Sequence, residues 1–531
     1  MSQTKGVTWP QISWYPFRIE SVMIGKDNPP PSQWYPPFCP SRSALPFPMT
    51  LDIILAQLDT IQVNGPLNRT ITQITHDSRK AGESDIFVAI RGDNVDGRKF
   101  TPNLNVAAVI ADAPVEVLPS VTTIIVPDAR VALAHASAAL HRHPSKEMFV
   151  VGITGTNGKS TTAGIIEHIF SENDIKTGVI GTIGHRLFGK PVQTQDGRTT
   201  PEASTMQSLL RHWREQGCQA VVMEVSSIGL AWNRVDGIRY SVACFTNFSR
   251  DHLDFHSSMD EYLEAKRRLF VDLVDEESTC ILNADDHACS ETPTIGKAWR
   301  FSTTQTPDVY ATDIQQQLDG TTCVIHTPIG SSRIQYPMIG LHNVENILCA
   351  FGVCIAKGLS LSSIRNSLRT LPAVPGRLER IDSPLPVFVD YAHSPDALAH
   401  VLKTLRPLCN GKIITVFGCG GDRDAGKRPL MGSIAEENSD ICVVTSDNPR
   451  SESPQQIIDD ITKGMKKQHP TFTLREEAIA YAIQQANVRT DVVLIAGKGH
   501  ETYQEILGVK HPFDDRMMAK KYVPKGENHA I

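Results

Sequence analysis

The segment Phe149–Thr161 (FVVGITGTNGKST) constrains the fold of this chain more than any other part of the sequence. It reads as an apolar strand, a loop with two glycines and the polar start of a helix. Glycines let backbone N–H groups converge on phosphate oxygens, and a helix N-terminus favours negative charge. A strand, loop and helix in this order predict an α/β domain with a nucleotide-binding loop at the carboxyl end of a strand.

The individual residues of the loop have expected roles. Lys159 is expected to reach the β- and γ-phosphates of ATP, and Ser160 or Thr161 to offer a hydroxyl to Mg²⁺. The strict pattern has a glycine where this chain has Ile153, so the loop is the variant G-x-x-G-K-[ST]. Such a loop does not by itself separate a ligase from a kinase or a switch GTPase. The predicted nucleotide contacts in the loop are Gly155, Thr156, Asn157, Gly158, Lys159, Ser160 and Thr161.

Further buried strands alternate with helical patterns along the chain, which predicts an α/β fold with mainly parallel sheets. A chain of 531 residues is too long for one core, and about 150 residues per domain suggests three. We predict a substrate-binding domain over 49–145, a central ATP-binding domain over 146–374 with a parallel sheet, and a doubly wound C-terminal domain over 375–531. The Pro-rich segment 1–48 predicts a disordered leader, or an upstream start codon with translation beginning at Met49.

Composition narrows the class of protein. The net charge is −6, so no global basic field favours nucleic acid or an acidic membrane, and no apolar run is long enough to span a bilayer. The beginning of the chain lacks the pattern of a secretory signal. The 11 cysteines are odd in number and form no C-x-x-C pair, which favours reduced thiols. We expect a cytoplasmic, monomeric enzyme.

A series of short motifs, in one order, resembles the Mur ligases of peptidoglycan synthesis. The resemblance runs from about Thr50 to the C-terminus and implies a three-domain architecture. The strings that carry it are TGTNGKST (154–161), MEVSS (223–227), TNFSRDHLDFH (246–256), NADD (283–286), GLHNVEN (340–346), PGRLE (375–379) and VDYAHSPD (389–396).

Three C-terminal strings resemble the family members that add the third residue of the peptide: GCGGDRDAGKRPLM (418–431), SDNPRSE (446–452) and GKGHETYQ (497–504). The resemblance implies phosphorylation by ATP of the D-glutamate carboxylate of UDP-N-acetylmuramoyl-L-alanyl-D-glutamate. The amine of meso-diaminopimelate then attacks the acyl phosphate.

The chemistry requires cations, because a carboxylate must approach a polyanionic triphosphate. Lys159, His252 and Lys266 are the predicted catalytic residues. The predicted magnesium ligands are Ser160, Glu224, His252 and Lys266, the last because it matches a lysine that is carbamylated in the family.

Asn343 and Asn346 resemble adenine-facing asparagines that precede an apolar helix. Arg377 and Asp390 resemble nucleotide contacts that the C-terminal domain brings to the site when the domains close, and His393 is expected nearby.

The two substrates have separate predicted sites. Asp77-Ser78-Arg79 and the turn Gly92–Phe100 resemble the family's UDP signature. The predicted muramoyl-peptide contacts are Ser78, Thr199, Thr200, Ser226 and Arg234, and the predicted diaminopimelate contacts are Arg423, Asp447, Asn448, Pro449, Arg450, Gly497 and Glu501.

Arg450 is the residue on which the predicted amino-acid specificity depends. Meso-diaminopimelate differs from lysine by a distal carboxylate, which a guanidinium can bind through two parallel hydrogen bonds. Lysine would place its own cation against that arginine. Arg423 is expected to hold the other carboxylate, and Gly497 and Glu501 the distal amino group.

Two positions depart from the family pattern. Ile228 stands where a histidine is frequent and Trp232 where a glutamine is expected, both beside the muramoyl-peptide pocket. Three alternatives remain open: a lysine-adding ligase of the same family, a related folylpolyglutamate or cyanophycin synthetase, and a P-loop nucleotide-binding protein without ligase chemistry.

Overall fold

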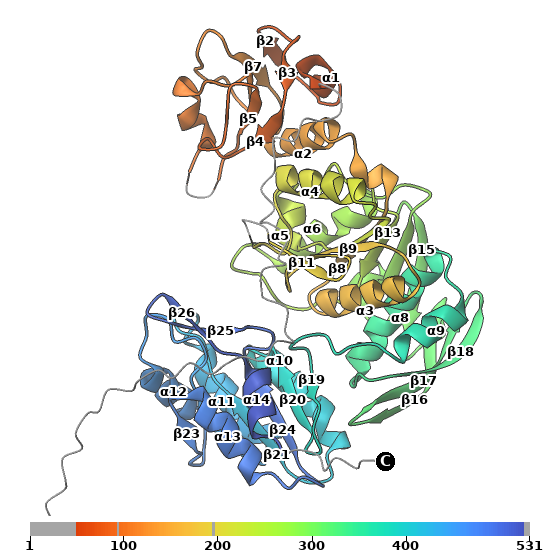
Figure 1. The fold of residues 1–531 in the computed structure, drawn as a ribbon, viewed down its shortest axis with the longest axis vertical. Helices are drawn as coiled ribbons and strands as arrows, with labels where there is room; N and C mark the ends of the chain where they lie inside the picture. Colours follow the sequence, from red (N-terminus) through yellow and green to blue (C-terminus); the bar gives the residue numbers. More distant parts are fainter. Residues whose placement is uncertain (1–48, 93–94, 194–196, 525–531) are drawn as a thin grey trace, which may run out of the picture.

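The computed structural model describes residues 49–92, 95–193 and 197–524. Three domains follow one another along the chain, each around its own main β-sheet (Figure 1). The predicted α/β architecture of three domains is therefore confirmed, whereas the predicted boundaries stay predictions. The interpretation of residues 1–48 and the centre of the turn Gly92–Phe100 lie outside the described residues.

The N-terminal domain contains a five-stranded sheet in the order β2-β7-β6-β5-β4, in which only β2 is antiparallel. Strand β5 is buried along its whole length, as expected of a strand covered on both faces. The elements are β1 Met49–Thr50, α1 Leu51–Leu55, β2 Gln62–Asn64, β3 Thr70–Ile71, β4 Gln73–Thr75, β5 Asp85–Ala89, β6 Ala108–Ala111, β7 Thr122–Ile125, α2 Ala129–Leu140 and 3-10 helices at Gly97–Asn103 and Pro144–Glu147.

The central domain contains an eleven-stranded sheet in the order β11-β10-β9-β12-β8-β13-β14-β15-β16-β17-β18. Helices α3 and α8 pack on one face and α4 and α6 on the other, which gives two separate cores. The elements are β8 Phe149–Thr154, α3 Lys159–Glu172, β9 Thr177–Ile180, β10 His185–Leu187, β11 Lys190–Val192, α4 Ala203–Glu215, β12 Ala220–Glu224, α5 Ser227–Ala231, β13 Val242–Phe245, α6 Met259–Val271, β14 Thr279–Asn283, α7 His287–Ser290, β15 Lys297–Ser302, β16 Val309–Gln317, β17 Gly320–Thr327, β18 Gly330–Tyr336, α8 Leu341–Ala356 and α9 Leu361–Leu368.

The C-terminal domain contains a six-stranded sheet in the order β19-β20-β24-β21-β22-β23. The four strands predicted from the sequence, β20, β21, β22 and β24, form its parallel centre. The elements are β19 Glu379–Ile381, β20 Val387–Asp390, α10 Pro395–Leu405, β21 Ile413–Phe417, α11 Lys427–Asn438, β22 Ile441–Thr445, α12 Pro454–Thr462, β23 Thr471–Phe472, α13 Arg475–Gln485, β24 Val492–Ala496, β25 Tyr503–Ile506, β26 Val509–Pro512, α14 Asp515–Tyr522 and a 3-10 helix at Arg406–Leu408.

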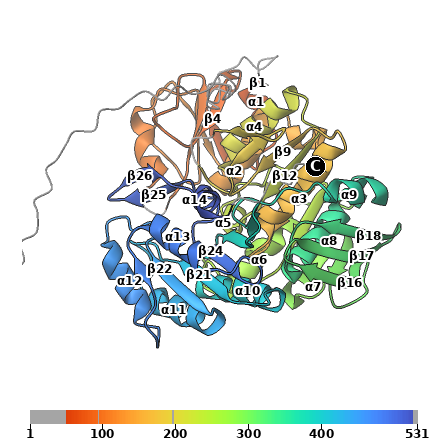
Figure 2. The ribbon, with the colours of Figure 1, turned by 60° about the horizontal axis from the view of Figure 1, so that its bottom comes forward.

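The central and C-terminal domains contact each other at several points (Figure 2). Ile339, just before α8, and Leu318, between β16 and β17, pack against the core of the C-terminal domain. His342 of α8 and His400 of α10 share a hydrogen bond of 2.9 Å between their ring nitrogens. Arg377 and His500, next to β19 and β24, lie close enough to the central domain for Arg377 to act on Lys159 and for Glu224 to act on His500.

Candidate active site

The phosphate loop lies between β8 and α3, as predicted. Gly155 has φ +140° and Gly158 has φ +85°, backbone conformations that favour glycine. A Cβ at Gly155 would overlap the Thr246 hydroxyl, and one at Gly158 would overlap the Asn346 side-chain oxygen. Both glycines are therefore required by the backbone and by close neighbours.

Residues that follow β13 hold the loop in shape. Thr246 donates from Oγ1 to the Asn157 carbonyl at 2.5 Å, and Asn157 donates its N–H to Asn247 Oδ1 at 2.9 Å. Thr156 donates its N–H to the Asn247 carbonyl at 2.9 Å. The motif TNFSRDHLDFH thus begins with residues that shape the phosphate loop, a role that the sequence alone did not reveal.

Lys159 folds back over the loop. Its Nζ donates to the carbonyls of Gly155 at 2.8 Å and Thr156 at 2.9 Å. Burial lowers the pKa of Lys159. The negative charge of Glu224 raises this pKa, and the positive charge of Arg377 lowers it further. An arginine from the C-terminal domain therefore acts electrostatically on the phosphate-loop lysine.

The two asparagines of GLHNVEN lie inside helix α8 rather than before it, which corrects the prediction of their position. Both are buried. Asn343 donates from Nδ2 to the Ile339 carbonyl at 2.7 Å, and Asn346 donates from Nδ2 to Asn343 Oδ1 at 3.1 Å. Thr162 donates to Asn346 Oδ1 at 3.1 Å, so this pair connects α8 to the start of α3.

The side-chain oxygen atoms of Ser160 and Glu224 lie next to each other beside the phosphate loop. Ser160 Oγ donates to Glu224 Oε1 at 2.8 Å, and Thr182 donates to both carboxylate oxygens, from its N–H and its Oγ1, each at 2.9 Å. A Cβ at Gly181 would overlap the Glu224 carboxylate. Oxygen atoms of this kind are the ligands that Mg²⁺ prefers.

Lys266 is almost fully buried on α6, with a side chain that is 1% exposed. Its Nζ donates to the Gly155 carbonyl at 3.0 Å and lies 4.5 Å from the centre of the Tyr262 ring. Burial, with Lys159 as the next cause, holds the pKa of Lys266 well below its ordinary value. The side chain therefore does not belong to a solvated charged face.

His252 contacts Tyr262, the residue whose ring Lys266 also contacts. Its backbone is left-handed with φ 52°, and its ring lies 5.9 Å from the Tyr262 ring. The nearest carboxylate contact is Asp251, at 3.8 Å from Nε2. Over the residues that the structure describes, no three His, Cys, Asp or Glu side chains gather as a metal site.

Arg377 lies in the turn just before β19, and Asp390 is the last residue of β20. Asp390 accepts hydrogen bonds from the N–H groups of Leu378 and Ala392 at 2.7 and 2.8 Å, and burial raises its pKa. Arg377 lies over the Tyr391 ring at 5.1 Å. His393 is held by its Nδ1 contact of 2.8 Å with the Tyr391 carbonyl. Asp390 thus shapes the loop that carries Arg377 toward Lys159.

Thr200, Ser226 and Arg234 lie together beside the end of β12. Thr200 Oγ1 donates to Ser226 Oγ at 3.0 Å, and Arg234 Nη1 donates to the Thr200 carbonyl at 3.2 Å. Thr199 reaches the same region, with 3.0 Å between its hydroxyl and that of Thr182. Ser78 lies in the N-terminal domain, in a turn where Asp77 is paired with Arg79.

Asn448 and Glu501 are in direct contact at the carboxyl ends of β22 and β24. Asn448 Nδ2 donates to Glu501 Oε2 at 2.8 Å. Lys498, which is fully buried, donates from Nζ to Asn448 Oδ1 and to Glu501 Oε2, each at 3.0 Å. Lys498 therefore links two predicted contacts of the amino acid, a role that its place in the sequence did not predict.

Arg450 has a left-handed backbone with φ 50°. A strained conformation of this kind in a non-glycine residue is frequent at functional sites. Its Nη1 donates to the Gly421 carbonyl at 2.7 Å, and its Nε lies 3.3 Å from Glu505 Oε2. Arg423 is exposed on the adjacent loop, and a Cβ at Gly497 would meet Asp447 Oδ2.

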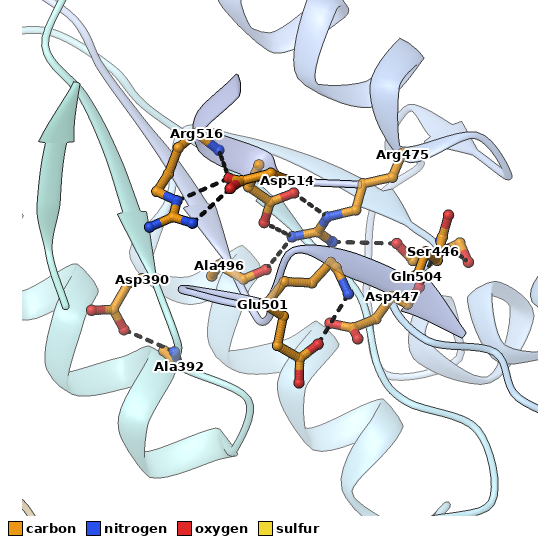
Figure 3. A network of polar contacts seen from close by, with 12 residues as sticks. Asp390, Ala392, Ser446, Asp447, Arg475, Ala496, Glu501, Gln504, Asp514 and Arg516 are labelled. Carbon is orange, nitrogen blue, oxygen red and sulfur yellow. Dashed lines mark hydrogen bonds and ion pairs between the residues drawn. The ribbon is translucent and has the colours of Figure 1, made fainter. Parts of the chain in front are cut away.

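Arg475, the first residue of α13, contacts the ends of the same strands (Figure 3). It donates to the carbonyls of Ser446 at 3.3 Å and Ala496 at 2.9 Å, and it forms a bidentate pair with Asp515 at 2.7 Å for each hydrogen bond. Both side chains are fully buried. This pair ties β22 to β24 across the intervening β21.

The comparisons with known proteins identify the family. The sequence matches the Mur ligase family, catalytic domain, over residues 70–147, the Mur ligase middle domain over 153–354, and the Mur ligase, glutamate ligase domain, over 376–499. Among the described helices, none is long and apolar enough to cross a membrane.

Several relatives are named UDP-N-acetylmuramoyl-L-alanyl-D-glutamate–2,6-diaminopimelate ligase. The one from Bacillus licheniformis is 41% identical, covering 85% of this chain and 94% of the relative. The one from Clostridioides difficile is 39% identical, covering 90% of this chain and all of the relative. A solved structure of a protein with this name is 32% identical, with a TM-score of 0.69, and covers 90% of this chain and 99% of that structure. The chain belongs to the Mur ligase family and is an ATP-dependent amide-bond ligase of that family.

Proposed function

We propose that the chain joins the amine of meso-diaminopimelate to the D-glutamate carboxylate of UDP-N-acetylmuramoyl-L-alanyl-D-glutamate, with cleavage of ATP to ADP and phosphate. The printed names of relatives that are about 40% identical support this reaction. We further propose that the enzyme acts as a monomer in the cytoplasm.

The choice of amino acid rests on one observation: Asn448 and Glu501 are in direct contact, and Arg450, two residues after Asn448, pairs through its backbone with Ile506 of β25, the strand that follows Glu501. A guanidinium, an amide and a carboxylate together suit a zwitterionic group with one carboxylate and one ammonium. The distal end of meso-diaminopimelate is such a group, whereas the distal end of lysine is an ammonium alone. Arg423, exposed on the neighbouring loop, would take the second carboxylate.

The protein's part in the phosphoryl transfer is positioning and charge neutralisation. The backbone N–H groups of Gly158–Thr161 and the Lys159 amine would hold the triphosphate, and Arg377 would add a second cation from the C-terminal domain. The N–H bonds to Asp390 fix the loop that carries Arg377. Transfer to the D-glutamate carboxylate forms an acyl phosphate, and attack by the amine releases phosphate.

Magnesium fits the residues present. Ser160 and Glu224 offer adjacent oxygen donors, and Lys266 would add two more oxygens if its amine were carbamylated. The depressed pKa of Lys266 supports this, because carbon dioxide reacts with the neutral amine. The ion would neutralise charge on the phosphates and hold them in line. His252 would complete the ligand set, with Asp251 as its nearest carboxylate.

The decisive experiment supplies the purified enzyme with ATP, Mg²⁺, the UDP-muramoyl dipeptide and equal concentrations of meso-diaminopimelate and L-lysine. The mass of the nucleotide product identifies which amino acid was joined. We expect the diaminopimelate product. The lysine product would refute the proposed specificity, and no product with either would refute the proposed reaction.

A further inference from the structure

Trp232, one of the two departures from the family pattern, lies between the N-terminal and central domains. The guanidinium of Arg130, at the start of α2 in the N-terminal domain, lies 4.5 Å from the centre of its ring. The guanidinium of Arg234, a predicted acceptor contact in the central domain, lies 4.7 Å from it. One indole therefore contacts a cation from each domain.

The turn that carries Trp232 and Arg234 is rigidly held. Asn233, between them, has φ 53°, a conformation that asparagine tolerates. Arg268 of α6 donates to Asn233 Oδ1 at 2.6 Å and pairs with Asp236 at 3.0 Å. The Trp232 ring also packs edge-on against Phe255, with 5.5 Å between centroids. The position of the indole is thus set by the surrounding central domain.

Positive charge is in excess around this indole. Arg198 and Arg234 both pair with the same oxygen, Oε1 of Glu202, and Arg234 is almost fully buried. Among the described residues, the Arg130 guanidinium pairs with no carboxylate, and it donates a hydrogen bond of 3.4 Å to the Arg91 carbonyl. Two of the three guanidinium groups therefore share one carboxylate, and the third, that of Arg130, is paired with none of the described carboxylates.

The same cluster reaches the predicted UDP signature. His76 directly precedes Asp77-Ser78-Arg79. Burial lowers the pKa of His76, and Arg198 and Arg130 act in the same direction, against the charge of Glu202. Arg130 and Arg198 therefore lie close enough to the UDP signature to act on the residue that precedes it.

We propose that Arg130 is a further binding residue for the anionic acceptor, and that Trp232 positions Arg130 and Arg234 together. The bound group is a phosphate or carboxylate oxygen of the UDP-muramoyl dipeptide, which carries both. Stacking on Trp232 uses the face of each guanidinium, so the N–H groups at its edge that make no other contact can donate hydrogen bonds to that oxygen. This inference rests on the proposed acceptor.

The test compares Arg130→Gln and Trp232→Gln with wild type in steady-state kinetics. We expect Arg130→Gln to raise the KM for the acceptor about tenfold, as for a lost charge-assisted hydrogen bond, with kcat and the KM for ATP unchanged. Trp232→Gln raises the same KM, and the effect of the double variant is smaller than the product of the two single effects, because Trp232 acts in part through Arg130. Arg69→Gln is the matched control, since Arg69 lies in the same domain but bonds the Ser120 carbonyl.

Calorimetric binding of UDP alone separates the two sources of the anion. Weaker UDP binding by Arg130→Gln indicates the diphosphate, and a loss seen only with the full acceptor indicates a peptide carboxylate. An unchanged affinity for both ligands, or an equal loss in Arg69→Gln, would overturn the inference. Should Arg130→Gln unfold, Arg130→Lys and Trp232→Phe provide the same comparison. The acceptor KM can be measured with either amino acid, so a wrong amino-acid assignment leaves this test intact.

Discussion

Lys266 donates a hydrogen bond from Nζ to the Gly155 carbonyl oxygen at 3.0 Å, so a buried amine of α6 contacts the phosphate loop directly. Lys159 donates to the same oxygen at 2.8 Å. Two lysines thus meet at one backbone carbonyl, in a place where a polyphosphate would bring negative charge.

We expect Lys266→Met to abolish amino-acid-dependent phosphate release and to leave the folded protein no less stable. The pKa of Lys266 is lowered in the folded state, so between that lowered value and the ordinary value the unfolded chain binds more protons. Across this window the wild-type free energy of unfolding rises with pH, and the substitution removes that contribution. Urea unfolding at several pH values measures it.

Arg267→Met is the control for this experiment, because Arg267 is the next residue of α6 and pairs with Glu264. It should retain activity. Full activity in Lys266→Met would contradict the proposed role of the amine.

Glu224→Gln should raise the Mg²⁺ concentration for half-maximal activity about 10- to 100-fold, the usual range for a lost contact at a metal site. The amide keeps the size of the side chain but removes the charge beside Ser160. A magnesium titration of initial rates measures the shift. Glu167→Gln removes a carboxylate of α3 that pairs with Arg186 and should leave the titration unchanged; an equal shift in both variants would count against a specific site.

The sequence predicted the strands and loops that carry the site because glycine loops and buried strands have local signals. It did not predict Lys498 or Arg475 as part of the site, since a lysine or arginine is usually exposed and its burial depends on distant partners. Lys498 is buried only because Asn448 and Glu501 lie on the loops around it. Strands β16, β17 and β18 were also missed, because their antiparallel pairing depends on contacts that no single motif encodes.

Asp515→Ala should destabilise the protein by about 3 to 5 kcal/mol, because it leaves the buried guanidinium of Arg475 without its carboxylate. Arg475 would then no longer be held in place as the donor to the Ser446 and Ala496 carbonyls. The KM of the folded protein for the amino acid should therefore rise. Urea unfolding and steady-state kinetics measure the two effects. Arg489→Ala, at an exposed position, should change neither.

Glu345→Gln should stabilise the protein at pH 8 by about 1 to 3 kcal/mol. Burial, with Asp285 and Asp286, raises the pKa of the Glu345 carboxyl to about 7. A raised pKa means that the folded state binds more protons than the unfolded chain, so stability is lost as pH rises from about 4.5 to 7. Thermal unfolding of both proteins at pH 5 and pH 8 measures the difference. A gain of the same size at both values would show that titration is not its cause.

The most direct test of the account is phosphate release with ATP, Mg²⁺ and the UDP-muramoyl dipeptide, with meso-diaminopimelate or L-lysine as the only amino acid, by wild type and Arg450→Lys. We predict that phosphate release requires meso-diaminopimelate. In Arg450→Lys, which loses the bidentate guanidinium, we predict that kcat/KM for the amino acid falls about 10- to 100-fold. Release that requires L-lysine instead, or that is unaffected by Arg450→Lys, would contradict the assignment of the amino-acid site.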